Sequence, residues 1–135
     1  MNAQFSKVER YNQHPSGIEC IQVVERMSFC LGNAVKYLWR AGHKDDVLDE
    51  LQKAQYYVLR AIEVDGLYTD YSHDRQLSLF CRQLEPHDRY GYTKAIRLII
   101  AGQGAGSLTT LQKAARLIRW CIENYPALEA SDPPL

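Results

Sequence analysis

Cations and aromatic rings recur at helical spacing between residues 33 and 57. Lys36 and Arg40 lie four residues apart, and Asp49, Lys53 and Tyr57 repeat this interval further along the chain. Because residues four apart share one face of a helix, each set leaves its helix on one side. Several cations beside tyrosine rings suit an anionic ligand with a flat ring, such as a nucleotide. The candidate ligand-binding residues are Asn33, Lys36, Tyr37, Lys44, Lys53 and Tyr57, and the candidate catalytic residues are Glu19, Arg40 and Asp49.

Each of these charges also has a purely structural interpretation. A charged stripe is typical of a solvated helix face with supporting ion pairs. Ser16 and Glu19 form a capping box, which predicts a helix from Gly17 to Leu31. The run DDVLDE at residues 45–50 offers carboxylates for Mg²⁺, but acidic residues in a first helical turn also complement the helix dipole. Both interpretations stay open at this point.

Two helices joined by a tight turn are expected to position the candidate residues. Gly32 is predicted to end the opening helix, and Asn33 to cap a short basic helix that Gly42 terminates in a left-handed conformation. Asp45 or Asp46 is predicted to cap the next helix, which runs to about residue 63. The result is an amphipathic hairpin with one charged face.

A second copy of this hairpin follows sixty residues later without a gap. Residues 34–63 and 94–123 are identical at ten of thirty positions, including the run LQKA at Leu51 and Leu111. This self-similarity predicts an all-α fold, in which a three-helix unit is duplicated in tandem and packed as one helical domain of residues 1–135. The first repeat covers residues 16–63, and the second, degenerate repeat covers residues 75–124.

The second copy keeps the apolar frame and loses most of the polar stripe. Ile96 and Ile100 replace Lys36 and Arg40, whereas Lys113 still matches Lys53. The first copy is therefore predicted to carry the chemistry. The added isoleucines must be buried under the first copy or against a second chain, and we expect a homodimer.

The rest of the second half is expected to be helices and turns. A helix is predicted over residues 75–84, and another from about Thr93. The segment GQGAGS at residues 102–107 is predicted to be a flexible turn and not a phosphate-binding loop, because it lacks the Walker order and no strand precedes it. Residues after about Pro126 are expected to be loosely held.

Composition narrows the class of protein. With 135 residues and 46% hydrophobic residues the chain can form one domain with its own core. A formal net charge of zero argues against a broad nucleic-acid surface. Apolar runs are too short for a membrane span or a signal peptide, so we expect a cytoplasmic protein. The four cysteines form no metal or disulfide pattern and are expected to be reduced core residues.

Three runs of the sequence, Gly17–Cys20, Phe29–Lys44 and Asp49–Tyr57, resemble the small nucleotide kinases without a P-loop that phages and prophages encode. The resemblance covers residues 11–63 and departs where the family has Glu-Asp-Leu, because this chain has Asp49-Glu50-Leu51. It implies phosphoryl transfer to a deoxynucleoside monophosphate in the host cytoplasm. Such transfer needs charge neutralisation and positioning. Arg40, Lys36 and Lys53 are then expected around the phosphates, Asn33 with Tyr37 or Tyr57 at the sugar or base, and Glu19 or Asp49 as proton acceptor or Mg²⁺ ligand.

Two other functions fit the same residues. The first is a protein without catalytic activity that sequesters a nucleotide or a nucleotide-derived defence signal, as a phage anti-defence protein would. The second is an all-α nucleotide pyrophosphatase, in which DDVLDE would be the metal cluster. The absence of a partner E-x-x-E motif argues against the second.

Overall fold

Residues 14–41, 46–64, 74–88 and 90–131 are described in the structure, a computed structural model. They form helices α2 (Cys20–Val24), α3 (Phe29–Ala41), α4 (Val47–Glu63), α5 (Arg75–Leu84), α6 (Tyr92–Ala105) and α7 (Leu108–Ser131), with the 3₁₀ helix η3 (Glu85–His87) after α5. These ranges contain no strand, which confirms the predicted all-α fold. No helix in the described ranges has both the length and the apolar composition needed to cross a membrane.

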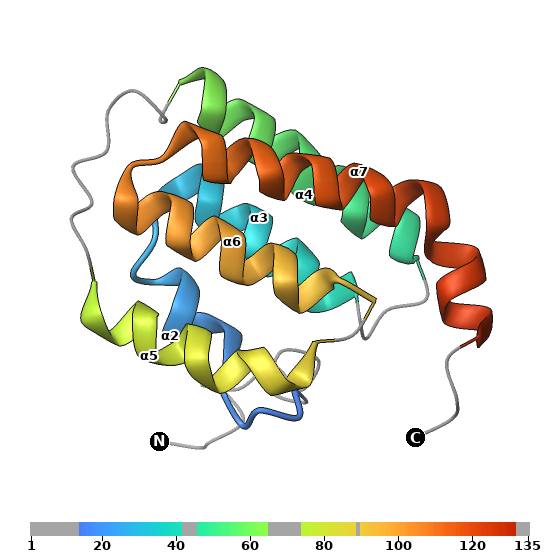
Figure 1. The fold of residues 1–135 in the computed structure, drawn as a ribbon, viewed down its shortest axis with the longest axis horizontal. Helices are drawn as coiled ribbons and strands as arrows, with labels where there is room; N and C mark the ends of the chain where they lie inside the picture. Colours follow the sequence, from blue (N-terminus) through green and yellow to red (C-terminus); the bar gives the residue numbers. More distant parts are fainter. Residues whose placement is uncertain (1–13, 42–45, 65–73, 89, 132–135) are drawn as a thin grey trace, which may run out of the picture.

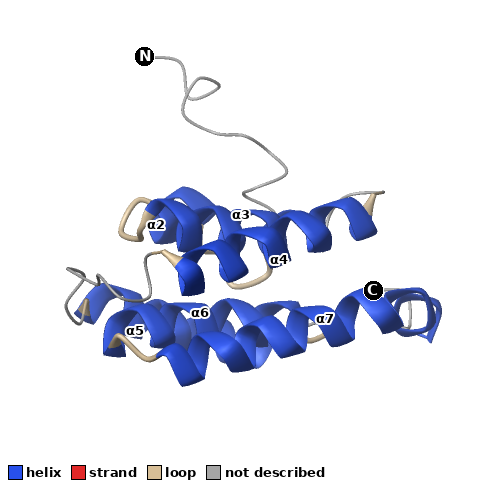
Figure 2. Ribbon diagram, turned by 90° about the horizontal axis from the view of Figure 1, so that it is seen from above, coloured by secondary structure: helices blue, strands red, loops and turns tan. Residues whose placement is uncertain are grey.

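The helices form two layers, which Figure 2 shows from the side. Helices α2, α3 and α4 make one layer, and α5, α6 and α7 make the other. Within the layers α3 packs on α4 and α6 packs on α7, while α3 contacts α6 and α4 contacts α7 between them. Figure 1 shows these two inter-layer pairs in face view. Helix α3 therefore has one face in the core and one face turned away from the other layer.

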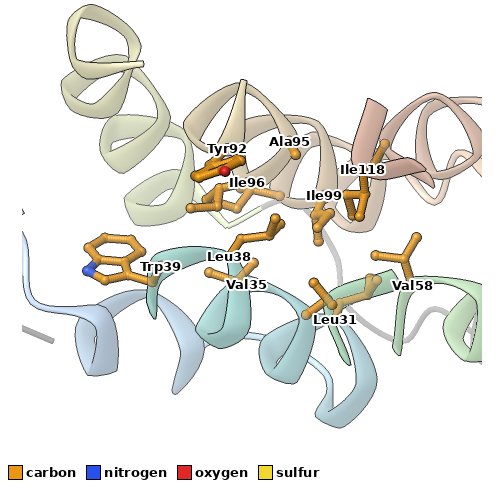
Figure 3. Packing of buried hydrophobic residues seen from close by; sticks show 14 of the residues in the cluster. Leu31, Val35, Leu38, Trp39, Val58, Tyr92, Ala95, Ile96, Ile99 and Ile118 are labelled. Carbon is orange, nitrogen blue, oxygen red and sulfur yellow. The ribbon is translucent and has the colours of Figure 1, made fainter. Parts of the chain in front are cut away.

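Apolar side chains fill the space between the layers. Figure 3 shows them facing one another: Leu31, Val35 and Leu38 from α3, Val58 from α4, Ile96 and Ile99 from α6, and Ile118 from α7. Each of these side chains is at most 2% exposed. Ile96, Ile99 and Ile100 are thus buried within the chain, so these residues no longer argue for a homodimer.

Equivalent residues of the two hairpins occupy equivalent places in this core. Leu51 and Ala54 of α4 are buried, and so are their counterparts Leu111 and Ala114 of α7. The opening helices differ, because α2 has 5 residues and α5 has 10. The tandem duplication stays an interpretation of the sequence repeat.

The start of the first unit differs from the prediction. Ser16 does not begin a helix; it lies in a turn in which Gly17 has φ 79° and donates its N–H to the His14 carbonyl at 3.0 Å. The helix begins at Cys20, with Glu19 as its N-cap residue, and the Glu19 N–H donates to Gln22 Oε1 at 2.8 Å. The predicted helix over residues 17–31 is therefore wrong.

Gly32 and Asn33 lie inside α3, so their predicted roles as helix stop and cap are also wrong. Gly32 is buried, and a Cβ atom there would come 3.4 Å from the Val24 carbonyl oxygen. This is close to an ordinary van der Waals contact, so Gly32 lies where α3 passes the end of α2 and does not break the helix. The chain breaks earlier, before Phe29, where the Ser28 N–H donates to the buried Gln103 side chain at 2.9 Å.

Other helix ends agree better with the bounds predicted from the sequence. Asp46 caps α4 by accepting from the Asp49 N–H at 3.1 Å, as predicted, while Gly42 and Asp45 lie outside the described residues. Helix α5 has its predicted bounds, and α6 begins one residue before the predicted Thr93. Helix α7 continues to Ser131 with Pro126 inside it, so the helix extends beyond the expected end.

Most of the segment 102–107 is helical and not the flexible turn that was predicted. Helix α6 runs to Ala105, and the turn is limited to Gly106, with φ 61°, and Ser107, whose hydroxyl accepts from the Thr110 N–H at 3.2 Å. Gly102 is buried where α6 meets α7, because a Cβ atom there would lie 2.7 Å from Leu111 Cδ2. Close packing of the hairpin, not turn formation, requires this glycine.

Alanine at two glycines of α6 tests this contact. Gly102→Ala should lower the free energy of unfolding by about 1–3 kcal/mol, because Leu111 is buried and has no room to move. Gly104→Ala is the matched control: no atom lies within 4 Å of its added Cβ, so it should raise stability by up to about 1 kcal/mol. Urea unfolding of both variants measures the difference, and equal effects would contradict the close packing of α6 on α7.

Candidate functional site

The candidate residues gather on the outer edge where α3 and α4 meet. We call this surface the α3–α4 seam and define it by Phe29, Asn33, Lys36, Tyr37 and Arg40 of α3 with Asp49, Glu50, Lys53, Tyr56 and Tyr57 of α4. The α3 members lie opposite the buried positions Leu31, Val35 and Leu38, because the helical period places them on the other face.

Aromatic rings form a continuous group along the seam. Tyr37 and Tyr57 stack with ring centroids 5.8 Å apart and an interplanar angle of 15°. Phe29 meets Tyr57 edge-to-face at 6.1 Å, and Tyr56 meets it at 5.1 Å. Tyr57 therefore contacts three other rings, and the group of four rings comes from both helices.

Two lysines from different helices converge on the ring of Tyr37. Lys36 Nζ lies 4.8 Å from its centroid and Lys53 Nζ lies 5.5 Å from it. Lys53 Nζ also lies 2.8 Å from Asp49 Oδ2. The hydrogen bond to Asp49 raises the pKa of Lys53, so this ammonium group keeps its charge at neutral pH.

Arg40 pairs with a buried carboxylate that the sequence interpretation did not select. Its Nε atom lies 3.7 Å from Glu50 Oε2, and the side chains of Arg40 and Glu50 are 14% and 2% exposed. The sequence analysis selects Asp49 as the candidate catalytic carboxylate, but the Asp49 side chain is half exposed. A sequence signal for Glu50 existed: it lies three residues after Val47 and four before Ala54, on the apolar face of α4. A carboxylate on that face must be paired when it is buried.

The remaining predicted residues are less central. Asn33 is half-buried one turn from both Phe29 and Tyr37 on the outward face of α3. Glu19 is the N-cap residue of α2, the place that the predicted capping box gave to Ser16, and it lies next to Cys20. Lys44 lies outside the described residues.

The four cysteines are free thiols; Cys20 and Cys121 are buried as core residues, whereas Cys30 and Cys81 are partly buried. Burial raises the pKa of the Cys20 and Cys121 thiols to about 12, and the Lys36 charge partly opposes this rise at Cys20. Lys36 therefore lies near α2 as well as at the seam. Thiols with such pKa values are almost entirely protonated at neutral pH, which makes them structural groups.

The carboxylates of DDVLDE in the described part of the chain already have partners. Asp46 caps α4, Asp49 pairs with Lys53 and Glu50 pairs with Arg40. No group of three or more His, Cys, Asp or Glu side chains able to hold a metal ion occurs among the residues that the structure describes. Asp46, Asp49 and Glu50 would each have to give up the present partner to hold a Mg²⁺ ion.

The second hairpin shows why its polar residues could be lost. Ile96 and Ile100, which align with Lys36 and Arg40, are at most 3% exposed. Ile100 lines the same hollow between α5 and α6 as Leu77 and Cys81 of α5. The residue that aligns with Glu50 is Thr110, so both members of the Arg40–Glu50 pair are replaced in the second copy.

Comparison with known proteins finds one similarity. Residues 7–59 match the model of a family, DUF3310, that is described only as a protein of unknown function. The matched range contains α2, α3 and most of α4, and therefore every residue of the α3–α4 seam. No curated protein and no solved structure matches the chain.

A double-mutant comparison tests the Arg40–Glu50 pair. Arg40→Ala should lower the free energy of unfolding by about 3 kcal/mol, because it leaves the Glu50 carboxylate buried without this cation. Arg40→Met combined with Glu50→Leu should recover most of that loss, since it removes both charges. Asp49→Ala is the control at an exposed pair and should change stability little. Denaturant unfolding measures the free energy of unfolding of each variant. An Arg40→Ala variant as stable as Asp49→Ala would show that the Arg40–Glu50 pair is not buried.

Proposed function

We propose that the α3–α4 seam binds a nucleotide. The observation that carries this proposal is the meeting of Lys36 and Lys53, from two different helices, at the ring of Tyr37. Two ammonium groups offer positive charge for a phosphate, and the neighbouring rings offer a flat apolar surface. The seam carries three cations, Lys36, Arg40 and Lys53, against two carboxylates, so the balance of these groups is positive.

The resemblance to the phage nucleotide kinases supports phosphoryl transfer at this site, with a deoxynucleoside monophosphate as acceptor. Transfer of this kind depends on charge neutralisation and positioning. In our proposal Glu50 holds the Arg40 guanidinium in one orientation, and Lys36 and Lys53 neutralise the phosphates. An oxygen of the monophosphate would attack the terminal phosphorus of a nucleoside triphosphate, whose bond to the departing nucleoside diphosphate breaks, and Glu19 or Asp49 would accept the proton when the attacking phosphate group carries one.

Binding without reaction is the second candidate function. Asp49 and Glu50 pair with Lys53 and Arg40, so both α4 carboxylates of the seam are engaged by cations of the same site. This observation favours a protein that sequesters a nucleotide or a nucleotide-derived signal, as a phage protein acting against host defence would.

Incubation of the protein with labelled nucleoside mono- and triphosphates and Mg²⁺ separates these functions. A labelled diphosphate product would support the kinase. Tight binding with unchanged nucleotide would support sequestration, and release of pyrophosphate or phosphate would support the pyrophosphatase. The absence of both binding and turnover would contradict nucleotide recognition altogether.

Replacing single lysines tests the location of the site. Lys36→Ala should weaken nucleotide binding by about 10- to 100-fold, the effect of losing a charge-assisted hydrogen bond. Stability should change by no more than about 0.5 kcal/mol, because Lys36 lies outside the core. Isothermal titration calorimetry and thermal unfolding measure the two effects separately.

Lys53→Ala and Lys113→Ala form a matched pair, since these residues are equivalent in the two hairpins. Only Lys53→Ala should weaken binding. If Lys113→Ala weakens it as much, the ligand lies between the two hairpins and not on the α3–α4 seam.

A further inference from the structure

Two of the seam's rings are unusually exposed. Phe29 is 75% exposed and Tyr56 is 61% exposed, more than any other large hydrophobic residue that the structure describes. Both contact Tyr57, so they lie at the same place on the seam. A cluster of exposed aromatic side chains is typical of a surface that binds a ligand or a partner, whereas single exposed apolar residues are ordinary.

The two exposed rings and the lysines lie in neighbouring parts of the seam, because Tyr57 contacts both exposed rings and stacks on Tyr37, which the lysines approach. Phe29 precedes Lys36 by seven residues, which corresponds to about 10 Å along α3. Tyr57 follows Lys53 by four residues on α4, and α3 and α4 pack together along this length. One end of the seam therefore presents ring surfaces, and the stretch beside it presents ammonium groups. A ligand that carries both a flat ring and a phosphate group can contact the two parts together.

We infer that the end of the seam formed by Phe29, Tyr56 and Tyr57 is a nucleobase subsite. The inference rests on the proposed nucleotide binding and adds the orientation of the ligand: the base stacks on Phe29, and the phosphate reaches Lys36 and Lys53. Every base has a π-face, so stacking alone discriminates little between bases. The seam should therefore distinguish a nucleotide from a sugar phosphate much better than one base from another.

The test compares two kinds of probe on the full chain. Isothermal titration calorimetry should show that the four deoxynucleoside 5′-monophosphates bind with similar affinities, and roughly 5- to 100-fold more tightly than deoxyribose 5-phosphate, the range expected for one base–aromatic stack. Phe29→Ala should remove this difference and leave the affinity for deoxyribose 5-phosphate unchanged. Phe29→Tyr should retain the difference, because it keeps a ring.

Leu79→Ala in α5 is the control, since Leu79 is also an exposed hydrophobic residue, at 40%, but lies in the other layer. It should leave all affinities unchanged. Circular dichroism confirms that each variant is folded, and Phe29→Leu replaces Phe29→Ala if the latter is not.

If the unmodified protein binds nucleotides and deoxyribose 5-phosphate equally, or if Phe29→Ala weakens both alike, the nucleobase subsite is wrong while phosphate binding at the seam stands. If the unmodified protein binds neither probe, the proposed function fails and the subsite with it.

Discussion

The packing of α3 against α6 divides α3 into a buried face and an open face, and the candidate site depends on this division. Leu31, Val35 and Leu38 reach into the core between the layers. Since a helix repeats every 3.6 residues, the same packing turns Lys36 and Arg40 away from the core. The charged face of α3 is thus a direct consequence of where its apolar residues are buried.

The Arg40–Glu50 pair adds a second constraint to the seam. A carboxylate that is 2% exposed has little water to stabilise its charge, so it depends on the nearby guanidinium group. The pair joins α3 to α4, with 3.7 Å between Arg40 Nε and Glu50 Oε2. The Asp49–Lys53 pair differs, because both of its members are half exposed and contribute little to stability. The Arg40–Glu50 pair is therefore largely buried between the two helices, and the Asp49–Lys53 pair lies at the surface.

Much of the fold could be predicted from the sequence, because long periodic segments such as Val47–Glu63 determine their own helices and Asp46 is a standard cap. The errors concern residues with two possible roles. The sequence favours breaks at Gly32 and Gly102, but both lie inside helices, and Gly102 allows close packing against Leu111. The grouping of Lys36, Tyr37, Lys53 and Tyr57 could be predicted from their spacing on an antiparallel hairpin. Glu50 and Phe29 were missed, since pairing and exposure depend on tertiary contacts.

We propose that a nucleotide binds at the α3–α4 seam and not at another surface. The most direct measurement is a titration of ¹⁵N-labelled protein with a deoxynucleoside monophosphate, followed by NMR. We predict that the largest amide shifts occur at Phe29, Lys36, Tyr37, Lys53 and Tyr57, with little change in α5 and α7. Shifts concentrated along the groove between α4 and α7, or in the hollow between α5 and α6, would contradict nucleotide binding at the seam.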